Sequence, residues 1–149
     1  MSLTLETQQI KQTLALKRAI DRRLNEVVRK ATALVARTGV ADASSKMQKN
    51  QFDNVLAVAE ETGSVEVVKN FIRYQIGRKD GLGWRHGGFG LELIKEIDWL
   101  EEQAKSIVTD HPNDKIDQDG AWMELVRLYI GYLRRDWVFQ RAQKGGEEI

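Results

Sequence analysis

Histidine is the side chain best suited to proton transfer near neutral pH, and this sequence has two, His86 and His111. A histidine metal site needs ligands at short helical spacings, whereas these two belong to separate expected loops. The sequence contains no cysteine, which excludes thiol nucleophiles, thiolate metal ligands and disulfides. His86 is therefore the one side chain that we would test as a general acid or base, and we expect it to have no chemical role.

Glycines could instead hold a phosphate group, and five of the twelve lie in GLGWRHGGFG, residues 81–90. A phosphate-binding loop of the GxxxxGK[ST] type is absent, and no strand is expected before this segment. The segment also has no GxGxxG in register, which argues against a dinucleotide site. Asp53, Glu60 and Glu61 share one short amphipathic segment, where carboxylates usually form the solvated face. We therefore expect a protein that is not an enzyme and needs no metal or cofactor.

Basic residues form a line on the first expected helix. At 100° per residue, Lys11, Arg18, Arg22 and Arg29 fall within about 20° of one direction and extend over roughly 27 Å. Two interpretations remain open. The line is either an ordinary solvated surface or a row of cations matched to a phosphate backbone.

A second basic cluster lies on the third expected helix and in the glycine-rich segment that follows it. Its members are Lys69, Arg73, Arg78, Lys79 and Arg85. Trp84 lies among them and could stack on an unpaired base. We expect it instead to fold back and cover the open end of the helical bundle.

The 149 residues are enough for one domain, with 42% hydrophobic and 30% charged residues and a net charge of +1. The charge alternates along the chain: residues 1–50 carry +6, 51–68 carry −4, 69–91 carry +4, 92–119 carry −6 and the remainder +1. Such blocks indicate a polyanion site or contacts between copies. An acidic helix could meet the basic first helix of a neighbouring copy, head to tail; its acids are Glu92, Glu96, Glu101 and Glu102.

The hydrophobic periodicity predicts an all-α, single-domain bundle of about five helices, residues 5–143 of a domain spanning 1–149, with a disordered tail over 144–149. The first helix is long and basic, and Ile10 and Leu14 belong to its expected core face. The second is expected to begin with a capping box formed by Ser45 and Gln48. The second helix follows Ser44 and Ser45 and stops at Gly63. The other four predicted ranges are 5–37, 65–76, about 91–108 and 121 to about 143. No segment resembles a membrane span or a cleaved leader, so we expect a cytoplasmic protein.

The order of segments resembles the small all-helical subunit of type III CRISPR–Cas effector complexes. The resemblance covers about residues 44–140 and rests on three stretches, KMQKNQFDNVLAVA, VEVVKNFIRYQIGR and FGLELIKEI. Members of that family show a T-x-Q-[LI]-R type helix entry, for which Lys49–Asp53 stands here with Asp53 in place of the arginine. They also show a YxxGR-like helix end, matched by Tyr74–Arg78.

The resemblance implies a subunit without catalytic residues, whose copies stack beside the guide–target duplex and whose basic residues contact RNA. The positions that would take this role are Lys46, Lys49, Lys69, Arg73 and Arg78. To these we add, on charge and placement, Lys79, Arg85, Arg18, Arg22 and Arg29.

The first hypothesis is therefore an RNA-binding structural subunit of a type III CRISPR ribonucleoprotein. Its expected partners are single-stranded target RNA or the guide–target duplex, other subunits of the complex, and further copies of the chain, head to tail, with no membrane. The alternative is a helical protein–protein adaptor or homodimer with solvated basic faces. A third class is an enzyme that uses His86.

Overall fold

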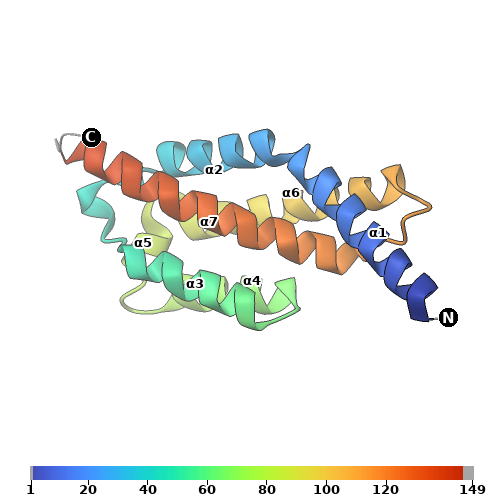
Figure 1. Ribbon diagram of the computed structural model, residues 1–149. Helices are drawn as coiled ribbons and strands as arrows, with labels where there is room; N and C mark the ends of the chain where they lie inside the picture. The colour runs from blue at the N-terminus through green and yellow to red at the C-terminus, as the bar shows by residue number, and fades with distance from the viewer. Residues whose placement is uncertain (1, 146–149) are drawn as a thin grey trace.

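The computed structural model describes residues 2–145, within which every regular element is helical (Figure 1). Six long α-helices, one single-turn α-helix and two short 3₁₀ turns follow one another along the chain. Their bounds are α1 Ser2–Asp21, α2 Leu24–Thr38, η1 Ala43–Ser45, α3 Lys49–Glu61, α4 Val65–Gly77, α5 Leu82–Arg85, η2 His86–Gly88, α6 Phe89–Asp110 and α7 Gln118–Lys144. The all-α bundle expected from the sequence is confirmed, with more helices than expected. The tail expected over 144–149 lies outside the described residues except for Lys144, which ends α7, and Gly145.

Helix α7 runs through the middle of the bundle and packs against α2, α3 and α6 (Figure 1). Because it has neighbours on several sides, its apolar residues are not confined to one stripe. Trp122 and Trp137 at its two ends are buried, and each indole N–H donates to a backbone carbonyl of another segment, Ile97 and Val40 respectively, at 2.9 Å. These two tryptophans therefore belong to the core, whereas Phe139 near the end of the same helix is 46% exposed.

The single helix predicted for residues 5–37 is wrong, because the chain breaks between α1 and α2 at Arg22 and Arg23. No glycine or proline marks the break. Instead, the Arg23 guanidinium donates to the Ser106 hydroxyl at 3.0 Å and to the Asp110 carboxylate at 3.5 Å on α6. The chain bends where this arginine is anchored, and the N-terminal part of α1 extends past the end of the bundle (Figure 1).

The break also changes which side chains enter the core. Ile10 and Leu14, predicted to face inward, are 60% and 43% exposed. Ala19 and Ile20, at the end of α1, are the first buried apolar residues of the described chain. The core therefore begins about one turn before the break, and the first three turns of α1 lie largely outside it.

The glycine-rich segment is compact rather than an open loop, because it contains α5 and η2. Trp84 is 1% exposed and packs 5.8 Å from the Phe89 ring, so the expected inward fold of this tryptophan is confirmed. Gly83 lies so close to the next segment that an added Cβ would meet the Met47 Cα at 2.7 Å. The glycine is needed here because two backbones touch.

The helix starts agree with the sequence in part. Helix α4 begins at Val65 as predicted, and Ser64 caps it by accepting from the Val67 N–H at 3.3 Å. The helix predicted as the second is α3, which begins at Lys49. Its capping box is formed by Gln48 and Gln51, not by Ser45 and Gln48. Ser45 is instead buried, and its hydroxyl donates to the Val40 carbonyl at 2.7 Å. This hydrogen bond holds the turn that precedes α3.

Candidate nucleic-acid interface

Three of the four basic residues that line up in the sequence meet at one hollow. Lys11 and Arg18 of α1 and Arg22 of the break line a surface hollow of about 300 Å³, which we call the α1 hollow. His111 and Asp114, from the segment between α6 and α7, line its other side. Leu14 and Ala15 complete the lining.

The cations of the α1 hollow are available to a ligand. Lys11, Arg18 and Arg22 are exposed, and within the described residues they form no ion pair or hydrogen bond through their side chains. The His111 ring is held by a 2.9 Å contact from Nδ1 to the Ile107 carbonyl. With Nδ1–H donating there, Nε2 is left as an acceptor in the neutral ring and becomes a second donor in the protonated one. Neither His111 nor Asp114 was selected from the sequence, because only the fold brings residues 111–114 beside α1.

Arg29, the fourth member of the line, is separated from the other three. It lies on α2, beyond the break, and is exposed without a partner among the described residues. The helical-wheel argument holds within one helix only. It therefore placed Lys11, Arg18 and Arg22 together and failed for Arg29.

Other cations of α2 are already neutralised within the chain. Arg37 donates to Glu96 at 3.0 Å and to Glu92 at 3.3 Å, and the Lys30 ammonium lies 3.7 Å from Glu96. Burial acts to lower the pKa of Arg37, but the hydrogen bonds to Glu96 and then Glu92 outweigh it, so the pKa is raised. Hydrogen bonds from Lys95 and then Arg37 lower the pKa of Glu92. Glu102 pairs with Lys105 on its own helix at 3.2 Å. Three of the four acids expected to meet a neighbouring copy therefore have partners within the chain.

The second basic cluster lies at the opposite end of the bundle from α1, around α5 (Figure 1). The close approach of Gly83 to Met47 brings the turn that carries Lys46 and Lys49 next to the segment that carries Lys79. Lys46 and Lys49 are exposed, as is Lys79, and none has a side-chain partner among the described residues. Arg73 on α4 is likewise exposed and unpaired there.

Two arginines of this cluster stabilise the end of α4. Arg85 donates to the Ile76 carbonyl at 2.7 Å, an acceptor that the end of a helix leaves unsatisfied. It also donates at 2.6 Å to the carbonyl of Arg78, the residue that follows α4. The Arg78 guanidinium donates to Gln75 and Asp80 and lies 5.7 Å from the Tyr74 ring. The Tyr74–Arg78 motif is thus a helix end whose arginine folds back on it, and both arginines have structural contacts.

Lys69 is placed differently from the other basic residues, because it is only 8% exposed. Its ammonium group donates to Asp98 at 2.7 Å and lies 3.5 Å from Glu66. Burial acts to lower the pKa of Lys69, but the hydrogen bond to Asp98 and the negative charges of Asp98 and Glu66 together outweigh it, so the pKa is raised. Its charge is already compensated, and we leave it out of the interface.

His86 lies in η2, where its Nε2 is near Gly39 and Asp42. The hydrogen bond from Lys144 lowers the pKa of Asp42, and the nearby His86 and Arg141 act in the same direction. Within residues 2–145, no three His, Asp or Glu side chains are arranged so that they could hold a metal ion.

Compared with protein-family models, curated proteins and solved structures, the chain finds no match. Among the described helices, none combines the length and the apolar character needed to cross a membrane.

Proposed function

We propose that this protein is a non-catalytic, RNA-binding helical subunit of a type III CRISPR ribonucleoprotein, as its resemblance to the small subunit of those complexes implies. In this proposal, copies of the chain lie along the guide–target duplex and contact its phosphate backbone. The observation that carries the proposal is the α1 hollow, where Lys11, Arg18 and Arg22 face solvent together without partners.

Five other cations differ from these three, because contacts within the chain already hold them. Arg23, Arg37, Lys69, Arg127 and Arg134 each contact an acid or a backbone carbonyl of another helix or turn. If the charges served only solubility, we would expect acidic residues to be distributed more evenly among all the cations of the surface. The α1 hollow and the Lys46–Lys49–Lys79 group lie at opposite ends of a bundle whose longest helix spans roughly 40 Å. An RNA phosphate backbone that runs along the bundle could contact both groups of cations.

The decisive measurement is fluorescence anisotropy of labelled single-stranded RNA against the protein over a salt series. Each phosphate contact contributes about 0.7 to the slope of log K against log salt for a single strand. The variant Arg18→Ala/Arg22→Ala should therefore bind more weakly and with a slope reduced by about 1.4. A second variant, Lys49→Ala/Lys79→Ala, tests the far end of the bundle in the same way.

The matched control is Lys95→Ala/Lys105→Ala on α6. It removes the same charge, from exposed lysines that pair with Glu92 and Glu102 at 3.2 Å on their own helix. Its salt slope should equal that of the unmodified protein. Equal losses in the control and in the Arg18/Arg22 variant, or no binding at low salt, would contradict the proposal.

A protein–protein adaptor or homodimer is the second candidate, and one observation favours it. Leu5, Ile10 and Leu14 are exposed apolar residues on a helix that extends past the bundle.

A further inference from the structure

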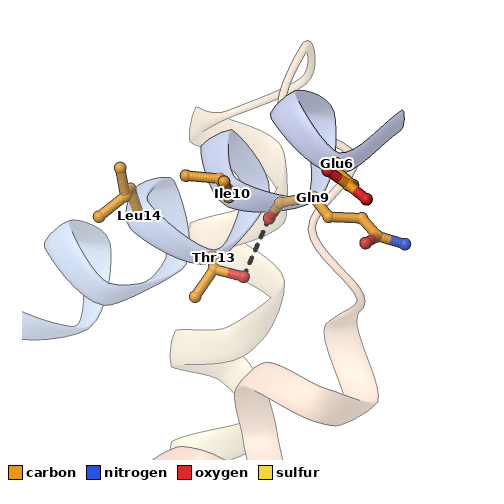
Figure 2. A pocket seen from close by; sticks show the side chains of 5 residues that line it. All are labelled: Glu6, Gln9, Ile10, Thr13 and Leu14. Atoms are coloured by element: carbon orange, nitrogen blue, oxygen red, sulfur yellow. Dashed lines mark hydrogen bonds between the residues drawn. The ribbon is translucent and has the colours of Figure 1, made fainter. Parts of the chain in front are cut away.

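The first turns of α1 expose apolar side chains in two directions. Figure 2 shows Ile10 and Leu14 pointing away from the helix on the same side, next to a shallow hollow of about 420 Å³ lined by five residues of α1 alone. We call Ile10 and Leu14 the outer ridge. At 100° per residue, Leu16 and Ala19, which face the bundle, lie about 160° and 140° from Leu14. The outer ridge therefore faces away from the protein's own core, and its residue Leu14 also borders the α1 hollow.

A helix in this position needs a partner. Isolated helices shorter than about 12–15 residues are marginal in water, and residues 4–11 of α1 are all exposed. Buried contacts begin only with the second half of α1, where Ala19 and Ile20 are buried. Gln8, Lys11 and Gln12 of the first half line only a surface hollow with residues 113–115. Packing of the outer ridge against another helix would stabilise the exposed half.

The spacing of this face is that of a coiled-coil seam. Thr7, Ile10, Leu14, Lys17 and Asp21 follow one another at intervals of 3, 4, 3 and 4 residues, which are the intervals between a and d positions of a heptad. With Ile10 at d and Leu14 at a, the apolar part covers two layers. The polar residues that follow limit its length, and polar residues at such positions fix register at a cost in stability.

The residues beside the seam indicate which helix would fit it. Glu6 falls at a g position and Lys11 at the e position of the following heptad. In a parallel, in-register pair of helices, g of one chain faces e of the next heptad in the other. Each Glu6 would then face Lys11 of the other chain, twice by symmetry. An antiparallel pair centred on the same ridge would instead set Lys11 opposite Lys11.

We propose that the outer ridge is a self-association surface, through which the α1 helices of two copies pair in parallel and in register. The bundles then lie on opposite outer sides of the pair, because the core-facing side of α1 is opposite the ridge. A seam of two apolar layers is smaller than a standard protein interface, so the dimer is weak and depends on concentration. This inference does not rest on RNA binding.

The absence of cysteine allows a direct test by disulfide trapping in the full-length protein. In the proposed register, each ridge residue faces its own copy, close enough for a disulfide, which needs a Cα separation under about 7 Å. Leu14→Cys and Ile10→Cys should therefore each form covalent dimers on mild oxidation, several-fold more than Leu5→Cys. Leu5 is a matched control because it is 63% exposed on the same helix and lies about 180° from Leu14.

Sedimentation analysis over a concentration series tests the proposed pairing of Glu6 with Lys11 of the other copy. The unmodified chain should rise from 17.0 kDa toward twice that mass. Glu6→Lys and Lys11→Glu should each remain monomeric, since each sets like charges opposite one another. The double variant Glu6→Lys/Lys11→Glu should dimerise again. Leu14→Glu should abolish dimerisation, and Leu5→Glu should leave it unchanged.

Three outcomes would overturn the proposal. Trapping no better at Leu14 than at Leu5 would exclude the ridge as a contact between copies. Covalent dimers only in a mixture of Ile10→Cys and Leu14→Cys would show an antiparallel pair. If the unmodified protein stays monomeric and Leu14→Glu weakens RNA binding, the outer ridge belongs to the nucleic-acid surface.

Discussion

Lys69 shows how far the environment of one residue can depart from what its type suggests. In the sequence it is a basic residue one turn from Arg73, and both belong to an expected nucleic-acid surface. In the structure Arg73 is exposed, whereas Lys69 is buried and donates to Asp98 at 2.7 Å. Its contact therefore links α4 to α6.

Replacing Asp98 should destabilise the fold by leaving the Lys69 ammonium with Glu66 alone. We expect Asp98→Asn to lower the free energy of unfolding by about 1–3 kcal/mol, because the buried Lys69 ammonium loses a charged hydrogen-bond acceptor, as measured by urea denaturation. Because the pKa of Lys69 is raised in the folded protein, its contribution is fully present below its unfolded pKa and is lost as the pH rises through the folded one.

The alkaline loss of stability should therefore be smaller in Asp98→Asn than in the unmodified protein. Glu102→Gln serves as the control, because it breaks an exposed pair with Lys105 on one helix and should change stability by less than about 0.5 kcal/mol. Similar effects of the two substitutions would contradict a structural role for Lys69.

At the scale of elements, the glycine-rich segment is best explained by packing. Gly83 lets α5 lie directly on the turn before α3, and Gly87 has a positive φ of 57° and lies against the Thr38 carbonyl. These contacts hold Trp84 in the core and place Lys79 near Lys46. Gly83 and Gly87 are therefore needed for close packing of the backbone.

The sharpest test of this element compares two alanine substitutions. Gly83→Ala should lower the free energy of unfolding by about 1–3 kcal/mol, because the added methyl group meets the Met47 backbone. Gly131→Ala, within α7, has open space around its Cβ and should raise stability by about 0.8–1 kcal/mol through helix propensity. Thermal or urea unfolding distinguishes the two, and a neutral Gly83→Ala would show that the packed turn is adjustable.

At the scale of the whole molecule, ion pairs join segments that are distant in the sequence. Glu92 and Glu96 of α6 hold Arg37 of α2, and Lys144 at the end of α7 holds Asp42 beside η1. The hydrogen bond from Lys144 lowers the pKa of Asp42, and those from Lys95 and Arg37 lower that of Glu92. These contacts connect the end of α2 to α6, and the segment beside η1 to the end of α7.

Both lowered carboxyl pKa values predict a loss of stability in acid. A carboxyl group with a lowered folded pKa contributes stability above its unfolded pKa, which is ordinarily near 3.8 for Asp and 4.5 for Glu. That contribution disappears as the pH falls through the folded pKa. The variant Asp42→Asn/Glu92→Gln should therefore show a shallower fall in the free energy of unfolding between about pH 5 and pH 3. An unchanged slope in urea denaturation at each pH would contradict it.

The sequence by itself determined the all-α class, the positions of α4, α6 and α7 and the grouping of Lys11, Arg18 and Arg22. Each of these depends on spacing within one helix, which the 3.6-residue period reports directly. Only the tertiary structure decided the break at Arg23, the burial of Lys69, the packing of α5 on the Met47 turn and the outward direction of Ile10 and Leu14. Each depends on a partner distant in the sequence, or on how far the core extends along a helix, and a local pattern carries neither.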